Sequence, residues 1–109
     1  MNESAIKQGT IYEFGKFTLD PGERVLLDDG RPVHLSSKVF DTLLLLVQKN
    51  GCLMTKDEMM SAIWDEAFVE ESNLAKNVSR LRKILNSDGG SLIETVPRLG
   101  YRFSADVTI

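Results

Sequence analysis

The segment from about Glu71 to Leu85 carries the residue types with the most evident chemistry in this sequence. In a helix, four apolar residues of this segment share one narrow stripe: Leu74, Val78, Leu81 and Leu85. The opposite side carries only hydroxyl, amide and cationic groups, from Ser72, Asn73, Lys76, Ser79, Arg80 and Lys83. Asn77 and Arg82 lie on the two flanks. A solvated helix usually mixes glutamates with its lysines, so the absence of acids from this face is informative in a chain with 16 of them.

These side chains suit contacts with DNA. Arginine can bind O6 and N7 of guanine with two hydrogen bonds, and asparagine can bind N6 and N7 of adenine in the same way. Lysine and serine reach phosphate oxygens. On these features alone two other interpretations stay open, an ordinary solvated face and a face that docks onto an acidic protein partner.

The distribution of charge supports the DNA interpretation more than the net charge of −3 does. Residues 1–71 contain 7 basic and 13 acidic residues, whereas residues 72–109 contain 6 basic and 3 acidic residues. Phosphate contacts are local, so a basic face on an acidic body can still bind DNA.

Composition excludes several other classes of protein. A chain of 109 residues has room for one domain with a single core. Cys52 is the only cysteine, which rules out an internal disulfide and a zinc-finger cysteine cluster. The longest apolar run, Leu43 to Val47, is far shorter than the roughly 20 residues of a membrane span. We find no paired nucleophile and base, phosphate-binding glycine loop or metal-ligand spacing, so we expect no enzyme, cofactor or metal site.

The elements that must position the basic segment follow from the pattern of apolar residues. After a flexible leader (residues 1–10), three strand-like runs at 11–19, 24–27 and 32–35 predict an antiparallel sheet over residues 11–35. Residues 36–86 then predict three helices. Ser36 is the N-cap of the first, Thr55 and Glu58 form a capping box on the second, and the third begins near Glu71. Two further runs, 92–96 and 101–105, predict a hairpin over residues 91–106. The fold class is therefore α+β, with the outline of a winged helix-turn-helix.

Two long motifs now carry a resemblance to a known family. VEESNLAKNVSRLRKIL (residues 69–85) and IETVPRLGYRF (residues 93–103) resemble the OmpR/PhoB-type winged-helix effector domain. The likeness is closer to CadC- and ToxR-like regulators, in which a TVPxxGYRF wing is common. LSSKVFDTLLLLVQKNG and TKDEMMSAIW resemble the first and second helices of the family. The resemblance covers about Tyr12 to Val107.

The resemblance implies a four-stranded N-terminal sheet, a three-helix bundle and a C-terminal hairpin wing. Only three N-terminal strands are visible in the sequence, and we expect the short run at Cys52 to Met54 to pair with the wing. In the family the third helix (about 71–85) enters the major groove of DNA, and the wing (92–105) reaches the minor groove or the backbone.

Site residues follow from the same positions. The resemblance implies a base-edge contact for Arg80 and contacts near bases or phosphates for Asn73, Lys76 and Asn77, with Ser72 beside them. Arg82 and Lys83 are expected on phosphates. The wing candidates are Thr95, Arg98 and Arg102. Leu99 departs from the pattern, because many CadC-like wings have a second basic residue there, and this predicts weaker binding at the tip.

The sequence therefore predicts a bacterial transcription regulator domain that binds double-stranded DNA, as a dimer or in tandem. A sensor domain elsewhere in a longer regulator, of the phosphorelay or CadC-like type, is the implied partner. RNA polymerase is a further implied partner. However, the loop that contacts it in several members of the family, Asp65 to Val69 in this sequence, is short. We expect a cytoplasmic location, including the cytoplasmic part of a membrane-anchored regulator. The alternative is a winged-helix module that docks onto an acidic protein.

Overall fold

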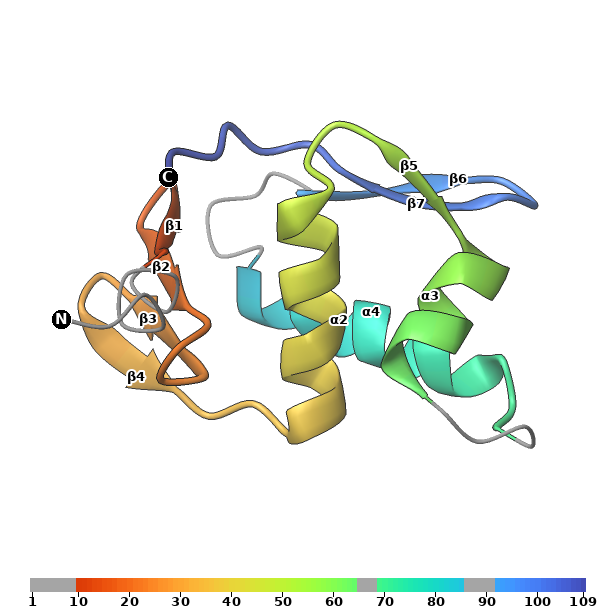
Figure 1. The fold of residues 1–109 in the computed structure, drawn as a ribbon, viewed down its shortest axis with the longest axis horizontal. Helices are drawn as coiled ribbons and strands as arrows, with labels where there is room; N and C mark the ends of the chain where they lie inside the picture. Colours follow the sequence, from red (N-terminus) through yellow and green to blue (C-terminus); the bar gives the residue numbers. More distant parts are fainter. Residues whose placement is uncertain (1–9, 65–68, 86–91) are drawn as a thin grey trace, which may run out of the picture.

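The N-terminal part of the chain forms a four-stranded antiparallel sheet. The computed structural model describes residues 10–64, 69–85 and 92–109, so nearly all of the expected leader lies outside the described residues. The strands β1 (Tyr12–Phe14), β2 (Phe17–Asp20), β3 (Val25–Asp28) and β4 (Arg31–Val33) follow one another in the sheet (Figure 1). Each adjacent pair is antiparallel.

The expectation of one strand over residues 11–19 is wrong. The chain reverses at Gly15 and Lys16, so that Phe14 pairs with Phe17 and the run becomes β1 and β2. Gly15 has φ +59, a left-handed conformation that glycine adopts without steric cost. The predicted hairpin between β3 and β4 is confirmed, since Asp29 and Gly30 both have positive φ, as a type I′ turn requires.

Three helices follow in the described ranges, and side chains cap the first two as predicted. Ser36 accepts a hydrogen bond from the backbone N–H of Val39 at the start of α2 (Ser37–Gln48). Thr55 and Glu58 form both bonds of the capping box on α3 (Lys56–Ile63). The pKa of Glu58 is lowered, mainly by the hydrogen bond with the Thr55 backbone and to a smaller extent by the hydrogen bond with the Thr55 side chain. The third helix, α4, spans Ser72–Leu85.

The wing belongs to a second sheet of three strands. β6 (Ile93–Val96) and β7 (Gly100–Phe103) form the predicted hairpin, and β5 (Leu53–Thr55) pairs with the other edge of β7. The expectation that the short run before α3 pairs with the wing is therefore confirmed. This arrangement ties the start of α3 directly to the wing.

The core lies around α2, which stands between the N-terminal sheet and the α3–wing half of the molecule (Figure 1). Phe14 of the first sheet meets Phe103 of the wing edge-to-face, with ring centroids 5.2 Å apart. Beyond the wing the chain returns to β1, where Glu13 and Thr108 exchange two backbone hydrogen bonds. The two sheets are thus held together through the core and through this return segment.

Candidate nucleic-acid interface

One face of α4 anchors the helix in the core, as the sequence predicts. Leu74, Val78, Leu81 and Leu85 are all at most 4% exposed. At roughly 25 cal/mol per Å² of apolar surface removed from water, such a stripe fixes which side of the helix faces out. The rotation of α4 about its own axis is therefore set by four apolar contacts with the core.

The opposite face of α4 points to solvent. Ser72, Lys76, Ser79, Arg80 and Lys83 are exposed, and no acidic residue occurs in the helix. Within the part of the chain that the structure describes, Lys76, Arg80 and Lys83 have no hydrogen-bond or ion-pair partner. Asn73 beside them is half-buried. Among the described residues, this outer face of α4 therefore offers free cations to a ligand, while the hydroxyl of Ser72 donates to the Glu70 carboxylate at 3.3 Å.

The amide of Asn77 faces α2. Its Nδ2 donates to the hydroxyl of Thr42 at 3.2 Å and to the carbonyl of Lys38 at 3.5 Å. Thr42 is fully buried and also donates to that carbonyl, so Asn77 completes the partners of a buried polar group. Asn77 thus holds α4 against α2.

The guanidinium of Arg82 bonds to the base of the wing. Nε and Nη2 donate to the carbonyl of Ile93 at 3.1 and 2.8 Å, and Nη2 donates to the hydroxyl of Thr95 at 2.6 Å. Two residues that the sequence assigned separately to DNA, Arg82 and Thr95, therefore bind each other.

The tip of the wing presents Arg98 and Leu99 to solvent. The backbone N–H of Leu99 donates to the carbonyl of Val96 at 3.0 Å, which closes a tight turn with Pro97 and Arg98 in the middle. Arg98 has φ +69, where a type II turn normally has glycine. Leu99 is 51% exposed. The third wing candidate, Arg102, lies across from Glu94 and pairs with its carboxylate at 2.9 Å.

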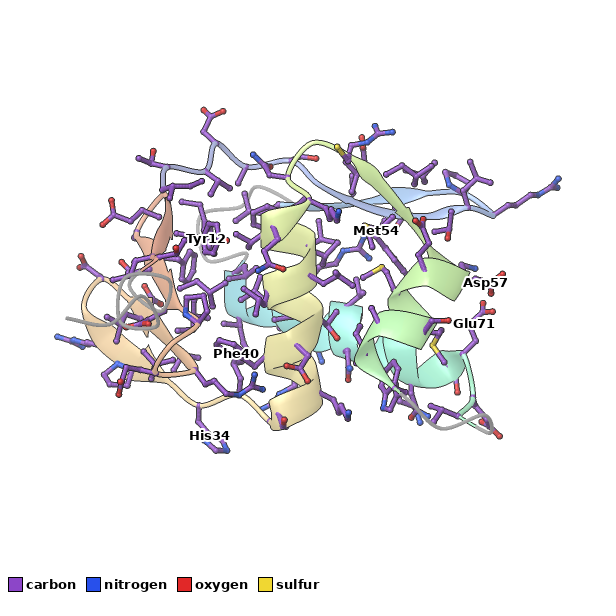
Figure 2. All side chains as sticks on the ribbon, in the orientation of Figure 1. Tyr12, His34, Phe40, Met54, Asp57 and Glu71 are labelled. Atoms are coloured by element: carbon purple, nitrogen blue, oxygen red, sulfur yellow. The ribbon has the colours of Figure 1, made fainter. Side chains whose placement is uncertain are left out.

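A polar hollow of about 430 Å³ lies between the wing tip and the starts of α3 and α4. Lys56, whose backbone N–H donates to the carbonyl of Leu99, lines it and pairs with Glu71 at 3.3 Å. Figure 2 shows Asp57 and Glu71 close together at this end of the molecule. Sequence reasoning missed Lys56, although its place at the first position of a capped helix beside the wing could have indicated it.

Other candidate chemistry is absent from the described ranges. Among residues 10–64, 69–85 and 92–109 no group of histidine, cysteine, aspartate and glutamate could hold a metal ion. His34, the lone histidine, is exposed and points away from the body of the molecule (Figure 2). In the same ranges no helix is long and apolar enough to cross a bilayer.

Comparison with known sequences identifies related proteins. Residues 30–103 match the family described as transcriptional regulatory protein, C terminal. The response regulator protein GraR of Staphylococcus epidermidis is 35% identical over 103 residues, which cover 84% of this chain and 46% of the relative. The transcriptional activator CadC of Escherichia coli is 26% identical over 103 residues, covering 92% of this chain and 20% of CadC. The chain thus spans less than half the length of these relatives.

Solved structures share the fold over most of the chain. The DNA-binding domain of E. coli CadC has a TM-score of 0.81 at 26% identity and covers 93% of this chain and 97% of its own. The DNA-binding domain of Klebsiella pneumoniae RstA, solved in complex with the RstA box, has a TM-score of 0.74 at 31% identity. It covers 87% of this chain and 97% of its own. The N-terminal sheet, three helices and hairpin wing are therefore the architecture of OmpR/PhoB-type winged-helix domains.

Proposed function

Because the chain belongs to the family of transcriptional regulatory protein C-terminal domains, we propose that it binds double-stranded DNA in a sequence-specific manner. In this proposal α4 enters the major groove, and the β6–β7 wing lies on the minor groove or the backbone. The observation that carries it is the outer face of α4, which is exposed, free of acidic residues and rich in cations that have no partner among the described residues. A solvated face would not need to exclude acids in a chain that is acidic elsewhere.

The side chains divide into groups by what they can reach. Arg80, in the middle of the outer face, is the candidate for bidentate contact with a guanine. Lys76 and Lys83 lie on the same face and are candidates for phosphates, with Ser72 and Asn73 at the helix start. Arg98 is the candidate cation at the wing tip. The similarity to the RstA DNA-binding domain, solved in complex with the RstA box, supports the proposal that this chain binds DNA.

Further parts of the proposal concern the binding partners and the cellular location of the protein. We propose that residues 11–109 act as one DNA-binding unit of a longer cytoplasmic regulator that also has a sensor domain. Binding as a dimer or in tandem would match repeated half-sites on DNA. Of the loop that would face RNA polymerase, Asp65 to Val69, residues 65–68 lie outside the described residues.

The proposal predicts a strong dependence of binding on salt. If roughly four to six phosphates are neutralised, log K should fall with log[salt] with a slope of about −4 to −5. The measurement is fluorescence anisotropy of a labelled random-sequence duplex between about 50 and 200 mM salt, the range over which this effect is large. Binding that does not change with salt would contradict the proposal. Absence of binding at the lowest salt would favour instead the alternative function, docking onto an acidic protein.

Arg98 offers a prediction in which stability and affinity change in opposite directions. Arg98→Gly should raise the free energy of unfolding by about 0.5–1 kcal/mol, because relief of left-handed strain outweighs the extra entropy of the unfolded chain. The same change should weaken DNA binding, since it removes a cation from the wing tip. Arg98→Ala is the matched control, which loses the same cation but keeps the strain. Urea unfolding and DNA titration of both variants test this, and equal stabilities would contradict it.

A further inference from the structure

Arg82 lies where α4, β6 and β7 meet. Its guanidinium donates twice to the carbonyl of Ile93, the first residue of β6, and once to the hydroxyl of Thr95 on the same strand. The guanidinium carbon is also 6.0 Å from the ring centroid of Tyr101, which pairs with Thr95 from β7. One side chain of α4 therefore contacts both strands of the wing.

The topology gives this contact its importance. β7 is the middle strand of its sheet and is held on one edge by β5, whereas β6 is an edge strand among the described strands. Two-stranded hairpins are marginally stable alone, so the wing depends on its attachments. β5 fixes β7 to the start of α3. Arg82 connects β6 to α4.

We propose that Arg82 is a positioning residue that fixes the angle of the wing relative to α4, and that it does not serve as a phosphate ligand. This inference rests on the proposed binding of DNA. Arg98 at the tip is five residues from Ile93, about 16 Å along an extended strand. A tilt of about 10° at the base would therefore move the tip by about 3 Å, enough to lose a contact made at a fixed distance.

The chemistry of the contact requires arginine. A planar guanidinium can donate two hydrogen bonds to one carbonyl while a further N–H reaches a hydroxyl, but a lysine ammonium cannot reproduce this fork. Lys83, the next residue of α4, is exposed and has no partner among the described residues. Arg82 and Lys83 are thus adjacent cations on one helix, of which only Arg82 is bonded to the wing. Lys83 is therefore the matched control.

A double-mutant cycle on DNA binding tests the inference. Arg98→Ala in the wild-type background should weaken binding about fivefold, through the lost tip contact. In the Arg82→Ala background the same change should weaken binding less than about twofold, because the tip is already misplaced. In the Lys83→Ala background, Arg98→Ala should weaken binding about fivefold, as it does in the wild-type background. Arg82→Lys should behave as Arg82→Ala does.

Additive effects of Arg82→Ala and Arg98→Ala, or retention of affinity by Arg82→Lys, would overturn the inference and favour a direct phosphate contact. Thr95→Val serves as a milder second variant if Arg82→Ala unfolds, and it should reduce the Arg98→Ala effect in the same direction. Hydrogen exchange in the free protein separates this inference from the proposed function. Arg82→Ala should speed exchange in β6 more than in β5 whether or not the chain binds DNA, and equal changes in the two strands would contradict the inference.

Discussion

Replacing Gly100 with alanine is expected to destabilise the fold by about 3 kcal/mol, at the upper end of the usual cost of overpacking. Gly100 begins β7 and pairs with Thr55 of β5. A Cβ atom at this position would overlap the backbone carbonyl oxygen of Met54 and lie 2.9 Å from the Thr55 Cα. Because both obstacles are backbone atoms, β5 and β7 must separate to admit the methyl group. Urea unfolding followed by circular dichroism measures the loss.

Gly51→Ala is the control for the general effect of adding a methyl group to a glycine. Gly51 has φ +82, but its Cβ would meet nothing within 4 Å. The control should therefore cost only the left-handed strain, about 1 kcal/mol. Similar losses of unfolding free energy in Gly100→Ala and Gly51→Ala would show that the close approach of β5 to β7 is not the reason for a glycine at position 100. The DNA-binding consequence should also differ, because only Gly100→Ala detaches the wing from the start of α3.

The second large effect is expected at Arg80, which is exposed at the middle of the outer face of α4. Arg80→Ala should lose about 1–3 kcal/mol of discrimination at a single base pair, the value of one bidentate contact with guanine. The free energy of unfolding should change by less than about 0.5 kcal/mol, because the side chain is on the surface. Titration of the preferred duplex and of its single-base-pair variants measures the discrimination.

Lys83→Ala is the matched control for Arg80→Ala, since it removes a cation from the same face of the same helix. It should weaken binding to all duplexes alike and make the slope of log K against log[salt] less negative by about one, as expected for a phosphate contact. If Arg80→Ala lowers affinity uniformly, as Lys83→Ala is expected to do, base recognition lies elsewhere on the molecule.

Features that depend on residues close in sequence could be predicted. The buried stripe of α4 follows from the spacing of Leu74, Val78, Leu81 and Leu85, which is local and periodic. The capping box of α3 spans only Thr55 to Glu58, so its two hydrogen bonds follow from residue types alone. The resemblance supplied what the local pattern did not show, the fourth strand of the N-terminal sheet.

Contacts between distant residues could not be predicted. Asn77 and Arg82 lie on the flanks of α4, where the helical wheel leaves their direction undecided. Their partners, Thr42 on α2 and Ile93 on β6, are brought to them only by the packing of the whole domain. The sequence therefore predicts a ligand contact for a polar flank residue on a basic helix, and only the folded structure shows the internal hydrogen bonds that this residue makes.

The division of β1 and β2 has a signal in the sequence. Phe14 and Phe17 are three residues apart, so an unbroken strand would place them on opposite faces of the sheet. Both are buried, because the turn at Gly15 and Lys16 directs them to the same side. Two large apolar residues at this spacing, with glycine between them, indicate a tight turn more than a continuous strand.

The central claim, that the outer face of α4 reads base sequence, is tested most directly by selection of bound sites from a pool of random duplexes. The selection is run in parallel with the wild-type chain and Arg80→Ala at physiological salt. We expect the wild type to enrich a short sequence and the variant to lose preference at one base pair of it. A wild-type chain that enriches no sequence, or a variant that selects an unchanged one, would contradict the claim.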